Sequence, residues 1–556
     1  MATDPPILPA GAEPEAIAPI VRGGGASTVA LGILSSRLIG FVRERVYAHY
    51  LGVGPHMDVL RVAFRAPNVI QNLLGEGTLS AAFIPIYARM VEEGRREEAG
   101  RFAGAVFGLL LAAAAGISLL GVLLARPIVA VLAAGFVRET GPVDRFELAV
   151  AAARIIFPMT GFLALAAWAL GVLNSHRKFF LPYFAPILWN AAIIGALVWA
   201  GGAGSGASMP LAALDRLLFA ACWGGLLGGL LQFLVQLPAV ARELRGFRLS
   251  FSTRVTGVKE AVATFVPVVA GRGIVQLSGY LDLFLASWLM VGAPSVLTYA
   301  QAPYMLPVSL FGLSVAAAEL PELARLRGTG TEQLLARVRR SLRQMGFLNV
   351  PTALGYLVFG YLIIGLLLRT GSFRETDNWL VYLVLCGYTV GLVATTSSRL
   401  LQNTFYALGE ARKPARIAAI RVAISTVLAV PLMFLLDRFA VTDFVRAEGE
   451  PLRMGAVGLA LGSGIAAWAE LLLLRRALAR SAPGPAVPWR DLGRMTALAV
   501  AAAVPAAMVW WFLPPLHIAL QALAVVGVYG AGYLLLGRLT GAEELGFWLG
   551  RFGSRR

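Results

Sequence analysis

The chain has 556 residues, of which 58% are hydrophobic and only 14% are charged. Soluble domains carry about 45–50% apolar and about 25% charged residues, so this composition excludes an ordinary soluble protein. The formal charge of +17 would suit a nucleic acid, but Lys and Arg fall mainly between apolar blocks. There they satisfy the positive-inside rule and contact anionic phospholipids, so we expect no nucleic-acid partner.

Apolar blocks long enough to cross a bilayer recur along the whole chain. About 20 helical residues span a ~30 Å hydrocarbon core, and the period-two alternation typical of a membrane barrel is absent from the sequence. We therefore predict an all-α integral membrane protein with about fourteen transmembrane helices. The predicted segments are 27–50, 58–90, 101–134, 147–173, 179–201, 211–238, 258–291, 295–320, 344–368, 378–408, 414–436, 453–474, 492–513 and 516–537.

The connections between these segments alternate in charge. Basic residues follow every even-numbered segment, as at Arg95 and Arg96, whereas Leu51–Met57 after the first segment contains none. The positive-inside rule then places both termini in the cytoplasm. Residues 1–26 lack the basic start and apolar core of a signal peptide and are expected to form a disordered cytosolic tail, with a second, basic tail at 541–556.

A short repeat divides the chain into two halves. Ala82–Met90 resembles Ala318–Leu326, and Arg177-Lys178 resembles Arg412-Lys413 at nearly the same offset. Six helices, an even number, separate the copies, so the halves share their topology and are related by an axis along the membrane normal. We predict two pseudo-symmetric six-helix lobes, an N-lobe at 27–243 and a C-lobe at 254–480, followed by two C-terminal helices within 489–540.

The second segment carries a polar stripe that a merely packed helix would lack. Its polar residues occur at steps of three and four, so they share one helical face. At 1.5 Å per residue the stripe is roughly 27 Å long. Each central charge costs about 2.5–3.5 kcal/mol on insertion scales, so this face lines a water-filled cavity or pairs across a helix interface. Its members are Asp58, Arg61, Arg65, Asn68, Asn72 and Glu76.

Arginines in other segments accompany this stripe. Arg37 and Arg43 lie in the first segment, Arg272 with Gln276 in the seventh, and Arg399 in the tenth. Arginine suits phosphate because its planar guanidinium forms bidentate bonds. Arginines that converge on a midplane cavity between two lobes therefore predict a binding site for a polyanion.

A structural alternative stays open for each of these charges. Buried ion pairs would also hide them, for example Arg61 or Arg65 with Asp58, or Arg43 with Glu44 of a neighbour. Basic side chains outnumber acids in these stretches, which leaves positive charge for a ligand to neutralise. Glu470 lies nearer a helix end, where snorkelling or pairing is expected.

No catalytic constellation is visible in the sequence. HExxH, GxSxG and GxxxxGK[ST] motifs are absent, and the two cysteines and four histidines are scattered. We therefore predict neither an enzyme nor a bound cofactor. Transport work would be driven by a gradient, the membrane potential or the ligand's own concentration, with the coupling ion left open.

Three stretches now make a family recognisable. Ser36–Glu44, Met57–Asn68 and Gly75–Pro85 resemble the MurJ (MviN) family of lipid II flippases, within the superfamily of multidrug and polysaccharide exporters. The resemblance covers about residues 27–540. It implies two six-helix lobes around a cationic cavity in the bacterial inner membrane, with a groove for the polyprenyl tail along 492–513 and 516–537.

The resemblance also implies roles for individual residues. Arg37, Arg43, Asp58 and Glu76 match family positions needed for transport, and Arg65 and Arg399 match positions that are usually basic.

The chain departs from the family at three places. It has Gln71 and Asn72 where the family often has arginine, and Gln301 and Ala302 where the family usually has an Asp-Arg pair. Arg61 and Arg272 would compensate for these losses. The acid of the sodium site of some members has no counterpart in 414–425, so sodium coupling is not supported.

The predicted function is a flippase for lipid II, an undecaprenyl-pyrophosphate-linked disaccharide peptide. It would move this peptidoglycan precursor from the cytoplasmic to the outer face by alternating access. One alternative is a flippase for another polyprenyl-pyrophosphate-linked saccharide. A multidrug exporter of cations would need an acidic cavity, and a non-transporting scaffold would instead bind proteins of cell-wall synthesis and division.

Overall fold

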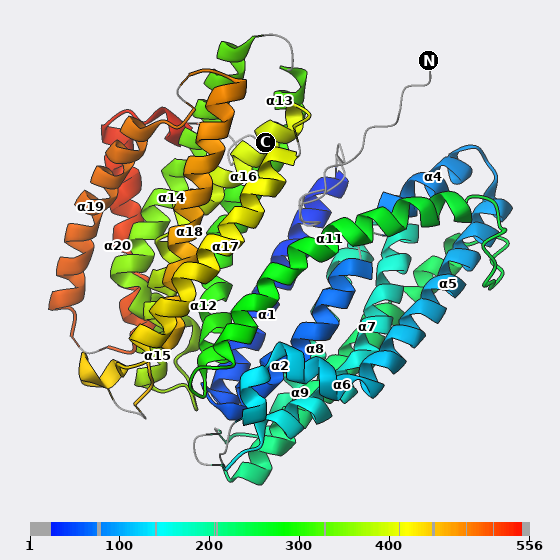
Figure 1. Cartoon of the computed structure of the whole chain (residues 1–556), viewed down its shortest axis with the longest axis horizontal. Coiled ribbons are helices and arrows are strands. Elements are labelled where there is room, and N and C mark those ends of the chain that lie inside the picture. The colour runs from blue at the N-terminus through cyan, green and yellow to red at the C-terminus, as the bar shows by residue number, and fades with distance from the viewer. Residues whose placement is uncertain are drawn as a thin grey trace. The chain divides into compact units, whose positions relative to one another are not determined.

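The computed structural model of the chain is helical (Figure 1). It describes residues 24–74, 79, 81–138, 142–204, 206, 209–326, 330–410, 412–447, 451–484, 486–514 and 516–546. Among these residues the only β-structure is one isolated bridge, between Ala440 and Arg453. The all-α prediction is thereby confirmed, as expected for a chain whose backbone must satisfy its own hydrogen bonds in lipid. Most of the two predicted tails lies outside the described residues.

The chain divides into two compact units. The first comprises Ala10–Ser295 with Thr370–Phe373, and the second comprises Val296–Arg369 with Arg374–Arg556. The predicted C-lobe begins at residue 254, whereas α11 belongs to the first unit, where it contacts α2, α5 and α6.

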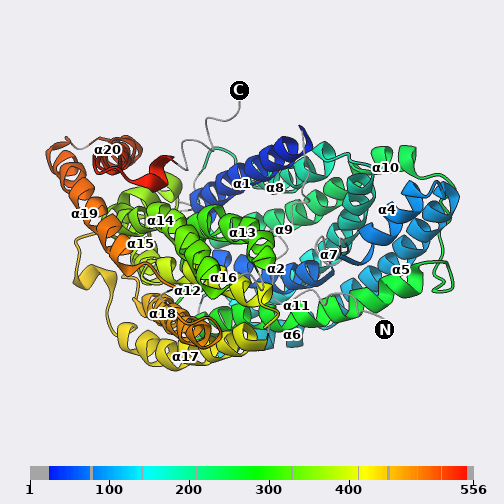
Figure 2. The same ribbon diagram turned by 90° about the horizontal axis from the view of Figure 1, so that it is seen from above.

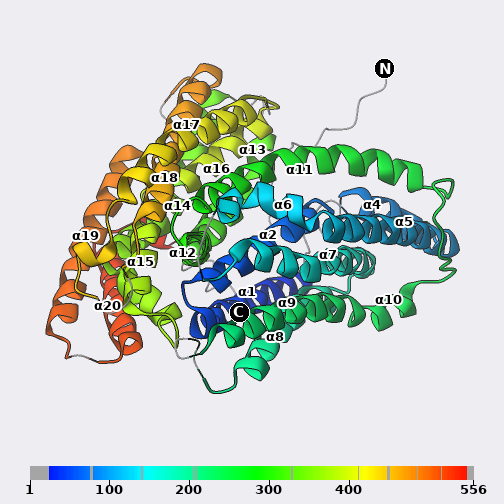
Figure 3. The same cartoon turned by 60° about the horizontal axis from the view of Figure 1, so that its bottom comes forward.

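The first unit is organised around α7. This helix packs against α2, α5 and α9, and 78% of its most apolar stretch is buried. On another side of the unit, α9 packs on α8 and α8 packs on α1 (Figure 3). The elements are α1 (Gly24–Leu51), α2 (Pro55–Leu74), α4 (Ile84–Glu92), α5 (Arg96–Leu123), α6 (Ala125–Leu132), η2 (Ala134–Arg138), α7 (Arg145–Ser175), α8 (Phe180–Gly201), α9 (Leu211–Leu234), α10 (Leu237–Glu243) and α11 (Val258–Ala286).

Glycines allow α8 and α9 to approach closely. A Cβ atom added at Gly228 would lie 2.8 Å from the Cα of Trp189, and one at Gly224 would lie 2.8 Å from the Cβ of Ala196. Small residues are favoured at such helix contacts in membranes because they let the backbones meet. This contact holds α8 against α9 at the residue, Trp189, that faces the charged cluster described below.

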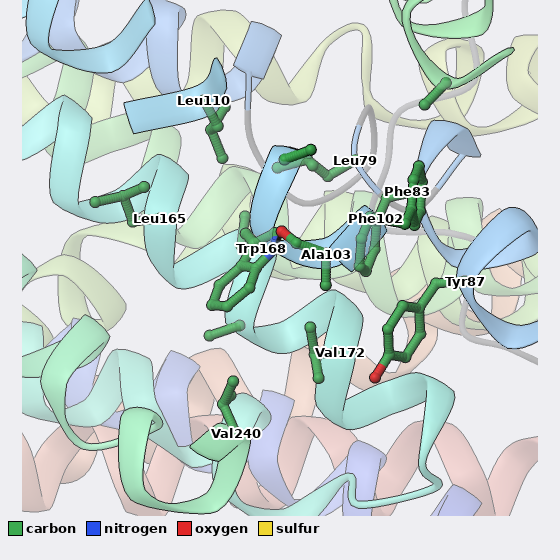
Figure 4. Packing of buried hydrophobic residues seen from close by; sticks show 14 of the residues in the cluster. Leu79, Phe83, Tyr87, Phe102, Ala103, Leu110, Leu165, Trp168, Val172 and Val240 are labelled. Atoms are coloured by element: carbon green, nitrogen blue, oxygen red, sulfur yellow. Dashed lines mark hydrogen bonds between the residues drawn. The ribbon is translucent and has the colours of Figure 1, made fainter. Parts of the chain in front are cut away.

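Aromatic rings fill the core where α4, α5 and α7 meet (Figure 4). Phe83 stacks on Phe102 with ring centroids 5.4 Å apart. The indole of Trp168 donates a hydrogen bond to the carbonyl oxygen of Ala103, at 3.2 Å. The only polar atom of this large buried ring is thereby satisfied, which fixes α7 against α5.

The connection between α10 and α11 packs against a row of glycines on α5. Cβ atoms added at Gly100, Gly104 and Gly108 would collide with the carbonyl oxygens of residues 245, 248 and 250. Phe247, in the same connection, packs on Phe107 with ring centroids 6.1 Å apart. The connection that leads into α11 is therefore seated directly on the backbone of α5.

The second unit is organised around α18 and α14. Helix α18 packs against α15, α16 and α17. Helix α14 packs against α19 and α20 (Figure 2). The elements are α12 (Ala293–Pro307), the π-helix η4 (Val308–Leu313), α13 (Ser314–Arg325), α14 (Thr331–Leu368), α15 (Glu375–Thr389), α16 (Leu392–Ala407), α17 (Arg412–Leu436), η5 (Val441–Asp443), α18 (Gly455–Ser481), α19 (Trp489–Phe512) and α20 (Ile518–Leu539).

Ten helical stretches of the described chain are long and apolar enough to cross a membrane. Each of the fourteen predicted segments coincides with a helix or with consecutive helices, but four of them are not among these ten: 27–50, 58–90, 258–291 and 295–320. Several predicted segments are divided: the third into α5 and α6, the sixth into α9 and α10, the eighth into α12, η4 and α13, and the tenth into α15 and α16. The described parts of the second segment belong mainly to α2 and α4. A multi-span helical protein is thus confirmed, and the total of fourteen stays a prediction.

Candidate functional site

Two arginines, Arg43 on α1 and Arg61 on α2, contact the carboxylate of Glu44 on α1. Arg43 donates a hydrogen bond to Oε1 of Glu44 at 2.9 Å. Arg61 donates to both carboxylate oxygens, at 3.3 Å to Oε1 and in a closer contact to Oε2. The Glu44 residue is 7% exposed, and the three groups together carry a formal charge of +1. The structural alternative paired Arg43 with Glu44 of a neighbour, whereas here Arg43 and Arg61 both pair with Glu44 of the same chain.

Two aromatic rings orient these guanidinium groups. Tyr47 lies one turn after Arg43, and its ring centroid is 5.6 Å from the Cζ of Arg43 and 5.4 Å from the Cζ of Arg61. The guanidinium of Arg43 also lies 4.9 Å from the ring of Trp189 on α8. Such cation–π contacts strengthen when they are withdrawn from water. The Trp189 indole is itself fixed by a contact to the sulfur of Met159, at 3.3 Å.

Arg65 and Arg37 extend this basic surface along the two helices. Arg65 follows Arg61 by one turn, is partly buried, and lies 5.7 Å from the ring of Tyr280 on α11. Arg37 is partly buried on α1, two turns before Glu44. Asn68 is partly buried on α2. By spacing, Arg65 lies on the face of α2 that carries Arg61, and Arg37 lies on the face of α1 that carries Glu44.

Asp58 has a different environment from the arginines of the same stripe. Its carboxylate is fully buried and accepts hydrogen bonds from Arg145 at 2.9 Å and from the backbone N–H groups of Gly292 and Ser295, at 2.6 and 3.0 Å. The Ser295 hydroxyl donates a further, short bond. A carboxylate in this position caps the first turn of α12. The expected partner of Asp58 in an ion pair was Arg61 or Arg65, but the structure places Arg145 there.

A second buried carboxylate lies in the second unit. Glu470 on α18 is 1% exposed, and its two oxygens accept hydrogen bonds from Gln402 on α16 at 2.8 Å and from Arg421 on α17 at 3.0 Å. Of the two expectations for Glu470, pairing is the one observed. Arg399 lies on the same helix as Gln402, three residues earlier, and is partly buried.

Several predicted site residues cannot be placed. Glu76 lies outside the described residues. Asn72, Arg272 and Gln276 belong to α2 and α11, but their side chains lie outside the described part of the chain. Gln301, at a position where the resemblance implied a charge, donates a hydrogen bond to the hydroxyl of Tyr388 at 3.0 Å.

The sequence did not point to the aromatic partners or to Arg145. Tyr47 could have been found from its spacing of one turn from Arg43, whereas Trp189, Tyr280 and Arg145 come from other helices and carry no local signal. Among the described residues, no group of three His, Cys, Asp or Glu side chains could hold a metal ion. The chemistry on α1 and α2 is that of a cationic, aromatic-lined surface suited to an anion.

Comparison with known proteins identifies relatives along most of the chain. The family model described as lipid II flippase MurJ matches residues 47–526. A probable lipid II flippase MurJ of Rhizobium meliloti is 31% identical over 91% of both chains. The lipid II flippase MurJ of Burkholderia cenocepacia is 30% identical, over 82% of this chain and 84% of that protein.

Solved structures share the fold. A lipid II flippase MurJ in an inward closed conformation superposes with a TM-score of 0.69 at 20% identity, over 92% of this chain and 98% of the other. An inward-facing multidrug resistance MATE family transporter of the MOP superfamily gives a TM-score of 0.60 at 16% identity, over 82% of this chain and 98% of the other. On the family match and the sequence identity of its relatives, the chain belongs to the MurJ family of lipid II flippases.

Proposed function

We propose that this protein moves lipid II across the bacterial inner membrane, from the cytoplasmic to the outer face, and that arginines of α1 and α2 bind the pyrophosphate of the cargo. The observation that supports this site is the unequal number of positive and negative charges at Glu44. One buried carboxylate is shared by Arg43 and Arg61, so that these three groups together carry a formal charge of +1 within a membrane protein. An anion would neutralise that charge and form the bidentate bonds that guanidinium groups favour.

Neutralisation gives a physical reason for a transport cycle. A cationic site is costly to enclose in a low-dielectric membrane, and a bound pyrophosphate lowers that cost. The loaded site can then close to one face of the membrane and open to the other. Such alternating access is a shift in population between an inward-open and an outward-open conformation. The membrane potential contributes ~2.3 kcal/mol per charge per 100 mV. We propose it, with the cargo gradient, as the energy source, and we propose no covalent chemistry and no bound cofactor.

The proposal includes an orientation in the membrane. The basic connections that follow the even-numbered segments would lie in the cytoplasm, with both termini, and would contact anionic phospholipid headgroups. Proteins of cell-wall synthesis and division are proposed as further partners. Cysteine labelling from either side of sealed vesicles would test the orientation: a thiol placed at residue 95 should react only from the cytoplasmic side.

The test of function is complementation in cells depleted of their own flippase. Cells that carry the wild-type chain should survive and expose lipid II on the outer face, whereas Arg37→Ala combined with Arg43→Ala should do neither. The control is Arg126→Ala, at an exposed ion pair with Glu147, which should rescue like wild type. Rescue without outer-face lipid II would indicate a scaffold. Rescue by the double variant would rule out the pyrophosphate role of these arginines.

A further inference from the structure

The two arginines at Glu44 differ in how they hold it. Arg61 contacts both carboxylate oxygens with its two terminal nitrogens, in the fork-to-fork geometry typical of a strong arginine–carboxylate pair. Arg43 donates through one terminal nitrogen to Oε1, the oxygen that it shares with Arg61. The carboxylate is therefore held mainly by α2, although it belongs to α1.

Arg43 keeps most of its hydrogen-bonding capacity. A guanidinium has five N–H donors, and the Nε of Arg43 is buried without a hydrogen-bond partner among the described residues. Its plane lies against Trp189 and near Tyr47, neither of which uses an N–H donor of the guanidinium in these contacts. Arg43 is thus oriented by aromatic rings and retains donors for another acceptor.

We propose that Arg61 is a positioning residue: by occupying both oxygens of Glu44, it leaves Arg43 available to bind the pyrophosphate of the cargo. This inference rests on the proposed function. The sequence alone placed Arg61 among the groups that contact the ligand, as a replacement for a lost family arginine. The geometry assigns it instead to Glu44, so that its effect on the cargo passes through Arg43.

The net charge of Arg43, Glu44 and Arg61 determines how firmly Glu44 holds Arg43. With Arg61, Glu44 and Arg43 in place the cluster has an excess positive charge. Without Arg61, Glu44 and Arg43 form a neutral one-to-one pair, and a buried carboxylate with a single partner holds that partner firmly. The cargo would then compete with Glu44 for Arg43. Removing the carboxylate as well would release Arg43 again.

This reasoning predicts a rescue that a direct contact would not give. In the full-length protein, Arg61→Leu should weaken binding of lipid II by about tenfold to a hundredfold, the range for losing one charge-assisted hydrogen bond. Adding Glu44→Gln to Arg61→Leu should restore the affinity to within about threefold of wild type. Arg61→Lys, which keeps the charge but not the fork, should lie between the two.

The experiment measures binding of fluorescent lipid II to each purified variant, with the thermal midpoint as a check of folding. Arg126→Leu with Glu147→Gln, at the exposed pair, is the matched control and should bind like wild type. If the double variant stays as weak as Arg61→Leu, Arg61 contacts the cargo directly. If Arg61→Leu and Arg61→Lys bind like wild type with only a lowered thermal midpoint, the pair is structural. Either result overturns the proposal. Where Arg61→Leu does not fold, Arg61→Gln is compared with Arg61→Gln/Glu44→Gln.

The same experiment separates this proposal from the function on which it rests. If wild type binds lipid II no better than it binds a neutral lipid of equal chain length, and Arg43→Gln changes nothing, the proposed function fails. If Arg43→Gln abolishes binding but the Glu44→Gln rescue is missing, the function stands and the positioning role of Arg61 falls.

Discussion

Replacing Asp58 by asparagine removes one charge from the buried ion pair between Asp58 and Arg145. The carboxylate of Asp58 accepts bonds from Arg145, Gly292 and Ser295, and Arg145 is itself only 3% exposed. Asparagine keeps one oxygen, which can still accept a bond from the first turn of α12. Its amide nitrogen, however, is a donor and would face either Arg145 or a backbone N–H group.

The expected cost follows from the burial of both partners. Removing one member of a buried ion pair costs about 3–5 kcal/mol because the other charge is left without compensation. The lost bonds to the backbone of α12 involve the same atoms, so their energies are not added to this figure. Against a native stability of roughly 5–15 kcal/mol, the loss is large. Arg145→Met should cost a similar amount, and the double variant should cost less than the sum of the two.

Thermal unfolding in detergent, followed by tryptophan fluorescence, measures this effect. The matched control is Asp215→Asn, the same substitution at a carboxylate that is 42% exposed and pairs with His56, where a loss of about 0–1 kcal/mol is expected. Asp58→Asn should lower the midpoint by several degrees more than Asp215→Asn. Equal midpoints, or strictly additive effects of Asp58→Asn and Arg145→Met, would refute the anchoring role.

Three further predictions concern other contacts. Gly104→Val would push a Cβ atom into the carbonyl of Arg248. It should therefore lower the thermal midpoint and speed trypsin cleavage in the 245–250 connection. The control Gly116→Val, at a glycine with open space around it, should do neither. His176 lies outside the membrane spans, and its pKa is lowered mainly because the imidazole is partly buried. The carboxylate of Glu243 raises this pKa, but Lys178 and Arg96 lower it further. The unfolded chain then binds more protons below about pH 6.5, so stability should fall as the pH drops through that value, and His176→Gln should flatten the slope between pH 8 and 5.5. Glu544→Gln should free residues 542–546 to exchange their amide hydrogens faster because buried Glu544 holds both Arg343 and Arg494. Glu543→Gln, at an 83% exposed partner of the same Arg343, should leave the exchange unchanged.

The helices were largely predictable because they depend on local sequence, whereas the breaks inside several predicted segments, such as the one between α15 and α16, were not. Apolar blocks of sufficient length fold as helices in lipid whatever their neighbours are. The charges between them were equally visible, and so was the polar face of α2. The family relationship followed from short strings such as Gly75–Pro85, whose residues lie partly outside the described structure.

The roles of individual polar residues were less predictable, because a helix face is wider than a single contact. Asp58, Arg61 and Arg65 follow each other at steps of three and four, yet successive positions at these spacings differ by roughly 40–60° around the axis. Asp58 meets Arg145 of α7 and Ser295, Arg61 meets Glu44 of α1, and Arg65 lies near the ring of Tyr280 on α11. Which residue of the stripe meets which partner is decided by tertiary packing.

Arg43 illustrates a second reason. Neighbouring residues point about 100° apart on a helix, so the angular positions of Arg43 and Glu44 would not by themselves bring the two side chains together. In the structure α1 runs unbroken from Gly24 to Leu51, and Arg43 nevertheless reaches Glu44. Four rotatable bonds give arginine this reach, so its contacts cannot be derived from the angular position of its Cα atom.

The two buried carboxylates suggest where each unit can interact with a polyanion. Glu44 is shared by two permanently charged guanidinium groups, whereas Glu470 has one guanidinium, Arg421, and the neutral amide of Gln402. Counting only these groups, the first set carries a formal charge of +1 and the second a formal charge of zero. A pyrophosphate that displaced Glu470 from Arg421 would leave the carboxylate buried with only an amide donor, which is costly. At Glu44, by contrast, a pyrophosphate can take Arg43 while Arg61 still satisfies both carboxylate oxygens. Anion binding is therefore favoured at the cluster around Glu44 and disfavoured at Glu470.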